Sequence, residues 1–557
     1  MRAKPIRKGS SDQTTALCLD TIALGKQALV FCASKRAAES QAEKIAKGRK
    51  EEQEVRSEVL DGVADKALDV LAHPTKQCKR LAACLRKGIA FHHAGLPSGQ
   101  RTLIEQAFRD GTIRVICSTP TLAAGLDLPA FRAVIRDHKR FSGQGMAPIP
   151  VLEYLQMAGR AGRPGMEEYG EAILVAGNQE EIERLTETYI HGIVEDIHSK
   201  LAVEPVLRTY ILSLVATEII TTKQELIDFF SETFYAKQFG NMKRLIATLT
   251  KMIKLLKKWE FLEQEEQEKQ GSEESSSIFV TASEMYGAEQ QANEEEKLVA
   301  TPLGQRVSEI YLDPLTAHLI LEGMSRLEKE LRSKEDEEQT FAVQHLISCS
   351  LEMRPLLRMK TSAVELVENI MDEQELILLD ENDFYEYSQD DYEDTILTAS
   401  FLNDWSNEFS EQQLLDKYGI RPGEITIKLQ RGEWLMYACE ELARVTKKKR
   451  LLSILRHIAL RTKHGVRSEL ITLLKFKGIG RVRARTLHAH GITSVKDVKQ
   501  AQMEKLKEII GPKTARQLKE EAGEKVEEQQ GEEEDAKAMQ AKPKKRSGQT
   551  DLNHYQE

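Results

Sequence analysis

The chain has 557 residues, of which 41% are hydrophobic and 30% charged, and its formal net charge is −9. This length predicts several domains with ordinary globular composition. No apolar run approaches the ~20 residues of a membrane span, and the first residues do not lead into a signal peptide. Seven cysteines are scattered without a C-x-x-C pair, so neither a metal site nor a disulfide framework is indicated. We therefore expect a cytoplasmic protein without membrane contact. The negative net charge argues weakly against nucleic acid, but the charge is unevenly distributed along the chain.

Short apolar runs alternate with helical stretches over residues 1–200. Each run has the length of a strand and is rich in β-branched or aromatic residues. The runs are residues 27–32, 88–93, 112–118, 133–136 and 171–175. Strands alternating with helices predict a doubly wound α/β domain with a parallel sheet, whose functional loops follow the carboxyl ends of the strands.

The segment from Gln156 to Arg163 places two arginines three residues apart, with Gly159 and Gly162 around them. On a helix, Gln156, Arg160 and Arg163 would share a face that the glycines leave bare. A pair of guanidinium groups on an open face suits a polyphosphate, because each guanidinium can grip two oxygens.

The pattern Q-x-x-G-R-x-G-R resembles motif VI of superfamily 2 helicases, in which these side chains reach a nucleotide held by a partner domain. His93-Ala94-Gly95-Leu96 resembles motif IVa, and residues 118–129 resemble motif V. The resemblance implies that His93, Thr119 and Thr121 contact nucleic acid and that Gly125 and Asp127 face the nucleotide. Residues 1–200 are thus identified as the second RecA-like domain of such a motor.

Residues 136–150, between motifs V and VI, contain two glycines and a proline-flanked extended segment, which predict a β-hairpin. The residues of this segment resemble those of the archaeal DNA helicases of the Ski-two-like group, relatives of the helicase half of DNA polymerase theta. In that family the hairpin splits the duplex. We expect Phe141 and Met146, near its tip, to wedge against the last base pair.

No phosphate loop G-x-x-x-x-G-K-[ST] occurs in the chain. An apolar run ends in Asp380-Glu381-Asn382-Asp383, which is similar to the magnesium-binding motif of this superfamily. That motif belongs upstream, in the first RecA-like domain. We therefore expect these residues to be part of an acidic surface. The family's ATP and Mg²⁺ would be held mainly by a first RecA-like domain, on this or a separate polypeptide. We expect these residues alone not to hydrolyse ATP.

Helices dominate after residue 200. Residues 201–302 predict a winged-helix domain with a β wing at 277–281, and residues 303–460 resemble the family's helical ratchet bundle. In that family one long helix carries an aromatic and a basic residue that contact the single strand. Trp434 matches the aromatic position. Ile427 stands at the basic one, which leaves the adjacent Lys428 as the candidate contact.

Positive charge is concentrated between Leu442 and Arg485, where fourteen Lys or Arg accompany a single acid, Glu469. This basic block predicts a nucleic-acid footprint. Residues 461–522 resemble a helix-hairpin-helix domain, in which Gly478 and Gly480 let backbone N–H groups approach a phosphate. Arg481 and Arg483 flank that hairpin, and residues 510–515 are a weaker copy of it.

Residues 523–557 are charged, low in apolar side chains and predicted to be disordered. Near their end, Gln549, Leu552 and Tyr555 have the spacing of the motif with which replication proteins bind a sliding clamp. One helical turn would place Leu552 and Tyr555 on one face.

By resemblance the chain is the C-terminal part of a 3′–5′ DNA helicase that acts on single-stranded and forked DNA during replication-fork repair and recombination. The sequence leaves three alternatives open. They are an RNA helicase of the same superfamily, a non-catalytic DNA-binding adaptor and a truncated gene model.

Overall fold

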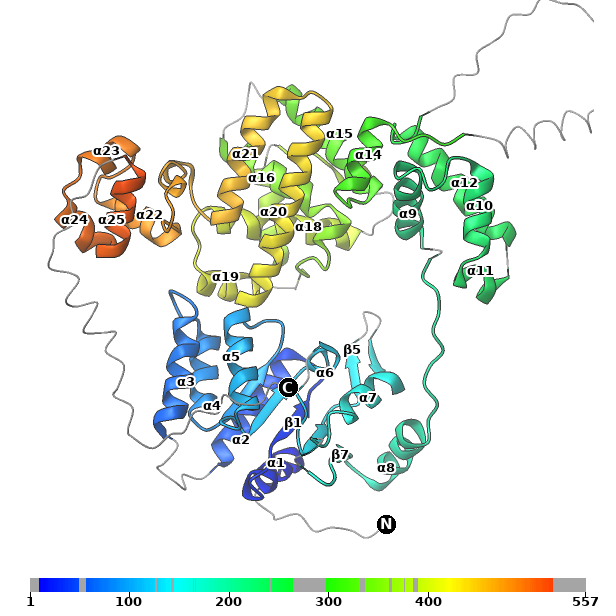
Figure 1. Ribbon diagram of the computed structural model, residues 1–557, viewed down its shortest axis with the longest axis vertical. Coiled ribbons are helices and arrows are strands. Elements are labelled where there is room, and N and C mark those ends of the chain that lie inside the picture. Colours follow the sequence, from blue (N-terminus) through cyan, green and yellow to red (C-terminus); the bar gives the residue numbers. More distant parts are fainter. Residues whose placement is uncertain are drawn as a thin grey trace, which may run out of the picture. The chain divides into compact units, whose positions relative to one another are not determined.

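The computed structural model describes residues 10–523 except 50–56, 126–127, 142–144, 164, 166, 202, 241, 264–296, 331–335, 360–362, 375 and 384–388 (Figure 1). The chain forms two compact units, residues 1–465 and 466–557. Each is described by itself. None of the helices in the described ranges is long and apolar enough to cross a membrane.

A five-stranded parallel sheet begins the first unit, in the order β2-β3-β1-β4-β7. The strands are β1 (Ala28–Phe31), β2 (Ile89–His92), β3 (Val115–Ser118), β4 (Arg132–Ile135) and β7 (Glu171–Leu174). The four strands β1 to β4 are buried along their whole length, as expected of a parallel sheet covered on both faces. The predicted doubly wound α/β domain is confirmed.

Helices flank this sheet (Figure 1). They are α1 (Gln13–Ala23), α2 (Lys35–Gly48), α3 (Ser57–Asp69), α4 (Lys76–Leu85), α5 (Ser98–Arg109), α6 (Thr121–Gly125), α7 (Val151–Ala158) and α8 (Gln179–Leu185). Helices α2 and α4 pack over β2, and α7 packs over β4. The hydroxyl groups of Ser34 and Thr75 accept hydrogen bonds from the first turns of α2 and α4, which fixes where both helices begin.

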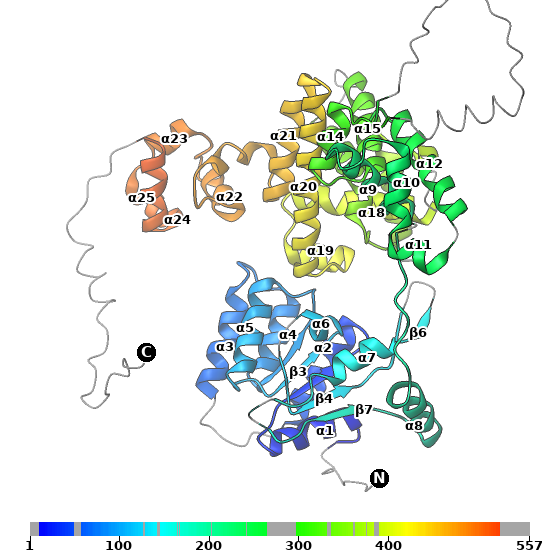
Figure 2. The same ribbon diagram turned by 45° about the vertical axis from the view of Figure 1, so that its right-hand side comes forward.

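The predicted hairpin between motifs V and VI is present as an antiparallel pair, β5 (Lys139–Phe141) and β6 (Met146–Pro148). Figure 2 shows this pair beside α7. The carboxylate of Glu195 accepts hydrogen bonds from the backbone amides of Val151 and Leu152, at 2.6 and 3.2 Å, and so caps the helix that follows the hairpin.

Helices make up the rest of the first unit. The first group is α9 (Glu204–Ala216), α10 (Lys223–Ser231), α11 (Phe234–Phe239) and α12 (Met242–Lys258), with isolated antiparallel bridges at Thr222–Lys297 and Leu262–Ala300. The wing expected at 277–281 lies outside the described residues. The second group is α14 (Pro302–Glu309), α15 (Pro314–Glu330), α16 (Asp336–Ser348), α17 (Val364–Glu373), α18 (Gln389–Ser406), α19 (Glu411–Tyr418), α20 (Pro422–Val445) and α21 (Lys449–His464).

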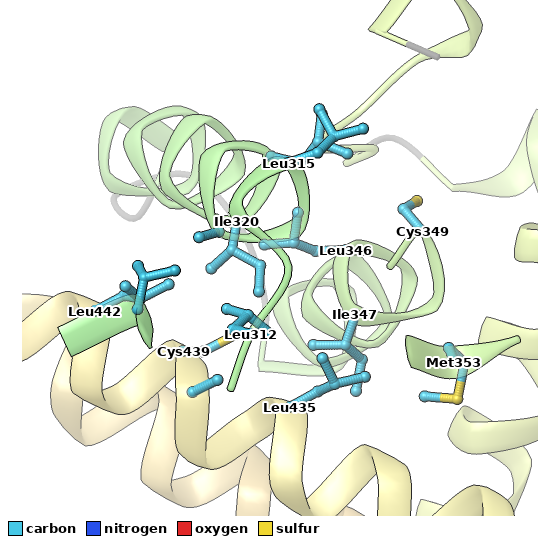
Figure 3. Close-up of a cluster of buried hydrophobic side chains, with 14 of the residues drawn as sticks. Leu312, Leu315, Ile320, Leu346, Ile347, Cys349, Met353, Leu435, Cys439 and Leu442 are labelled. Atoms are coloured by element: carbon cyan, nitrogen blue, oxygen red, sulfur yellow. The ribbon is translucent and has the colours of Figure 1, made fainter. Parts of the chain in front are cut away.

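Both helical groups share one hydrophobic core, which runs from Leu207 on α9 to Ile458 on α21. Figure 3 shows part of it, where side chains of α15, α16 and α20 meet. A buried ion pair also joins the groups, because Arg208 Nε lies 2.9 Å from Asp313 Oδ1. The segment 376–383 was predicted to belong to an acidic surface. Leu378 and Leu379 are instead buried in the same core, so the prediction holds only for Asp380 and Glu381, which are exposed.

The second unit is a small helical domain with its own core. Its helices are α22 (Arg481–Ala489), α23 (Val495–Gln500), α24 (Met503–Ile510) and α25 (Pro512–Glu521). Ile479 and Ile510, each just before a hairpin glycine, are buried in this core and anchor the two hairpins from inside.

Candidate functional site

Motif VI begins on α7 but its arginines lie beyond the helix. Helix α7 ends at Ala158 with Gly159 as its C-cap, and Gly162 has a φ of +90°, which no helix accommodates. The prediction that Gln156, Arg160 and Arg163 share a helical face is therefore wrong. Gln156 is exposed on α7, Arg160 lies in the turn that ends this helix, and Arg163 follows Ala161, which forms a bridge with Ala130.

Arg160 joins motif VI to motif V. Its Nε donates a hydrogen bond of 3.1 Å to the carbonyl oxygen of Ala123 on α6, and its Nη2 donates to the same oxygen. The structure thus brings together two segments that the sequence assigned to the nucleotide. Gly125 closes α6, and Asp127 lies outside the described residues.

Arg163 is held by protein partners. Its Nη2 lies 2.8 Å from Glu167 Oε1, its Nη1 donates 2.5 Å to Gln27 Oε1, and its Nε is buried without a hydrogen-bond partner. Two guanidinium groups in this region fit the negative charge of a triphosphate. For Arg163 to contact one, its ion pair with Glu167 must open.

The motif V hydroxyl groups lie at the carboxyl end of β3. Thr119 Oγ1 and Thr121 Oγ1 are 2.9 Å apart, and Thr121 is exposed. The hairpin, which follows β4, leaves Phe141 and Met146 directly opposite each other, with 71% and 64% of their surface exposed. Large apolar side chains at a hairpin tip are available to contact a base pair.

His93 does not have the role expected of it. Its side chain is fully buried, its Nδ1 accepts a 3.1 Å hydrogen bond from the Gly95 amide, and its Nε2 lies 3.1 Å from Glu39 Oε1. Because Nδ1 accepts, the ring proton sits on Nε2 and is donated to Glu39. In this structure His93 therefore supports the loop after β2 and is not exposed to nucleic acid.

Lys428 is likewise unavailable to nucleic acid, since it is only 6% exposed and its Nζ donates to the carbonyl oxygens of Met353, at 2.6 Å, and Pro355. Burial, together with the charge of Arg431, lowers the pKa of Lys428 to about 8. Trp434 packs half-buried against the bundle core, and Tyr437, which the sequence did not single out, is 46% exposed on the same helix.

Sequence reasoning missed a cluster around Glu39, which we call the Glu39 cluster. Besides His93, its members are Gln77, Arg80 and Arg421, whose nitrogens lie 2.9, 2.7 and 3.2 Å from the Glu39 carboxylate. Burial raises the pKa of Glu39, but the His93 hydrogen bond and the Arg421 charge outweigh it and hold the pKa at about 2. No local signal marks Glu39, which resembles any acid on an amphipathic helix.

The matches to known families cover most of these elements. A helicase conserved C-terminal domain matches residues 69–165, and a helix-turn-helix domain matches residues 170–263. Domain 4 of archaeal helicases matches residues 341–465, and a SAM-like helix-hairpin-helix tandem matches residues 470–524.

Curated relatives are similar over almost the whole chain. The ATP-dependent DNA helicase Hel308 of Methanococcus vannielii is 36% identical over 536 residues, which cover 93% of this chain and 69% of the relative. The chain belongs to the Hel308 helicase family. Hel308 of Methanocella arvoryzae is 36% identical, covering 94% of this chain and 66% of the relative, and Hel308 of Pyrococcus abyssi is 34% identical, covering 89% and 63%. The chain thus spans about two thirds of the length of these relatives.

In this Hel308-family chain the tandem helix-hairpin-helix presents two open glycine hairpins. Gly480 and Gly511 each begin a helix, α22 and α25, and a Cβ added to either would meet no atom within 4 Å. Gly478 has a φ of +81°, so a side chain there would strain the backbone. Arg483 is exposed but donates a 2.8 Å hydrogen bond to the Gly478 carbonyl, and Arg481 is half-buried.

The basic block is less positive than its sequence suggests. Arg461 is 1% exposed and donates hydrogen bonds to Thr340 and Asn407. Five other cations of the block are paired with acids, in the pairs Arg444–Glu441, Lys448–Glu328, Arg456–Glu440, Lys463–Glu433 and Arg485–Glu469. The predicted footprint therefore shrinks to the remaining cations. The clamp-motif residues Gln549, Leu552 and Tyr555 lie outside the described residues.

Proposed function

We propose that this chain supplies the DNA-handling part of an ATP-dependent helicase that moves 3′ to 5′ along a single strand and opens forked DNA in repair and recombination. The observation that carries the proposal is the exposed Phe141–Met146 pair on a hairpin between motifs V and VI. The relatives are named ATP-dependent DNA helicases, which favours DNA over RNA as the substrate. Such a motor acts in the cytoplasm of a prokaryotic cell, where the chromosome lies.

In this proposal the single strand follows Thr119 and Thr121 in the second RecA-like domain and stacks on Trp434. Gly478, Gly480, Arg481 and Arg483 hold the backbone of the DNA at the helix-hairpin-helix. Aromatic stacking and backbone amides suit strand binding without sequence preference. We also propose the sliding clamp as a partner of the C-terminal residues, from their sequence alone.

Arg160, Arg163 and Gln156 would complete a nucleotide site whose phosphate loop and Mg²⁺ ligands belong to a first RecA-like domain. Bound ATP supplies the free energy for movement. In arginine-finger motors the finger contributes about 10³–10⁵ in rate by stabilising charge on the transferred phosphoryl group. Arg163 has the charge for this role once it leaves Glu167.

The test is ATP hydrolysis by the 557 residues, alone and mixed with the first RecA-like domain of the Methanococcus vannielii relative. We expect no DNA-stimulated hydrolysis by the chain alone and clear hydrolysis by the mixture. Arg163→Ala should abolish it, whereas Arg184→Ala, at an exposed position of α8, should not.

Hydrolysis by the chain alone, or a mixture in which Arg163→Ala is harmless, would contradict the proposed nucleotide role. A mixture that binds DNA tightly but never hydrolyses ATP would favour the non-catalytic adaptor.

A further inference from the structure

Helix α20, which carries Trp434, begins against the loop that follows β2. The Gly423 amide donates a 3.1 Å hydrogen bond to the Gly95 carbonyl. A Cβ on Gly423 would overlap the carbonyl oxygens of Ala94 and Leu96, and a Cβ on Gly95 would overlap the Arg421 side chain. Gly423 is thus required where the two backbones meet, which is a mark of direct docking.

Oppositely charged side chains of α2 and α20 face each other at this contact. Lys35 and Glu39 lie one turn apart on α2, and Arg421 and Glu424 lie at the start of α20. Lys35 Nζ pairs with Glu424 Oε1, and Arg421 Nε lies 3.2 Å from Glu39 Oε1. Glu424 also accepts the Arg421 backbone amide at 2.9 Å, so the residue that caps α20 is itself held by α2.

Glu39 anchors this contact from inside the RecA-like domain. It is 3% exposed, and Gln77, Arg80 and His93 of its own domain hold its carboxylate in place. Arg421 is the member of the Glu39 cluster that comes from the helical bundle. Because a buried carboxylate with fixed donors has little freedom, the start of α20 is fixed to the sheet.

We propose that Glu39 and Arg421 are positioning residues that fasten α20 to the second RecA-like domain, so that the helix moves with the sheet during each nucleotide cycle. The inference rests on the proposed helicase function, because it assigns the fastening a task in strand movement. The side chain that stacks on the strand would then be carried by the domain whose motion ATP drives.

The fastening is tested in the chain itself with nitroxide labels on Arg109→Cys and Gln430→Cys, exposed positions on α5 and α20. All seven native cysteines are buried, so labels attach to the introduced ones. Pulsed dipolar spectroscopy should give a narrow distance distribution in the parent chain. Arg421→Gln and Gly423→Ala should each broaden it and add a longer-distance population.

Two matched controls exist in the structure. Arg80→Gln also removes a cation from Glu39, but Gln77 and His93 still hold the carboxylate, and Arg80 touches nothing on α20 in the hydrogen bonds described. Gly432→Ala also adds a methyl group to α20, where the nearest atom to its Cβ would be 3.7 Å away. Both controls should keep the narrow distribution. If Arg421→Gln does not fold, Gly423→Ala, which retains every charge, carries the test.

The coupling is tested in the chain mixed with a first RecA-like domain. Arg421→Gln and Gly423→Ala should keep the KM for ATP and most of the turnover, but open fewer base pairs per ATP than the controls. An unchanged distance distribution, or duplex opening that falls only in proportion to ATP turnover, would overturn the proposal. If the mixture shows no ATPase at all, the proposed function fails, whereas the label distances still decide whether α20 is fastened.

Discussion

At the scale of single residues, His345 shows how burial sets a charge state. The ring is wholly enclosed in the bundle core and burial lowers its pKa to about 4, with Nε2 lying 3.1 Å from Thr395 Oγ1 and Nδ1 without a partner. Between pH 6.5 and 4 the unfolded chain therefore binds more protons than the folded chain, and the free energy of unfolding falls as the pH falls. The loss is about 3 kcal/mol at most, from 1.36 kcal/mol per pKa unit.

We therefore expect the unfolding free energy to drop between pH 7 and pH 5, and His345→Phe to reduce that slope. Urea titrations followed by tryptophan fluorescence measure it, because all three tryptophans contact the hydrophobic core that contains Ala342 and Leu346, His345's neighbours on α16. His490→Phe, at an exposed position of the second unit, should leave the slope unchanged. Equal slopes for the parent and His345→Phe would contradict the assignment.

At the scale of elements, the hairpin before α22 gives different roles to two glycines for which the sequence predicted the same role. Gly478 is needed by the backbone itself, whereas Gly480 has an ordinary φ of −98° and open space around it. A side chain at Gly480 would thus leave the fold intact and block only an approaching phosphate. This hairpin therefore combines a glycine that the backbone conformation requires, Gly478, with one that leaves room for a contact, Gly480.

Gly480→Val should weaken binding of single-stranded DNA and should reduce the slope of log affinity against log salt by about one, as expected when one phosphate contact is lost. Fluorescence anisotropy at several salt concentrations measures both. The matched control is Ala489→Val, exposed at the other end of α22. Unchanged affinity and slope would rule out a phosphate contact at Gly480, and a loss of helicity would show that the substitution had damaged the fold.

At the scale of the whole molecule, the net charge does not reveal which surfaces are suited to bind DNA. A net charge of −9 coexists with a basic block in which much of the charge is neutralised locally. The proposed sliding clamp would be a different kind of partner. It would bind the spaced apolar residues of the last segment, where Gln556 stands in place of the motif's second aromatic residue, so we expect modest affinity.

A peptide of residues 541–557, titrated calorimetrically against the clamp of the same organism, should bind with measurable heat. Replacing Leu552 and Tyr555 by alanine should remove binding, because both would fill one hydrophobic pocket. Replacing Asn553 and His554 by alanine should change little. Absence of binding, or indifference to the loss of Leu552 and Tyr555, would exclude the clamp as a partner.

Local patterns in the sequence were enough to predict the parallel sheet, the hairpin between the motifs and the helix-hairpin-helix. Each of these has a local signature, such as a buried apolar run of strand length or glycines between amphipathic helices. The family resemblance followed from the same local signals, because a motif is a set of neighbouring residues in a required order. Even so, the helical face expected for Arg160 and Arg163 was wrong, since α7 ends at Ala158 and Gly162, beyond it, has a φ of +90°.

By contrast, the exposure of individual charges and the contact between α2 and α20 could be learned only from the way the chain packs in three dimensions. His93, Lys428 and Arg461 read as surface contacts in the sequence, but each is buried with hydrogen-bond partners from distant segments. Arg421 and Glu39 are 382 positions apart, so no pattern within a sequence window relates them. The physical reason is that a charge acquires its environment from whatever the fold packs around it, whereas strands and helices are specified by the spacing of their own side chains.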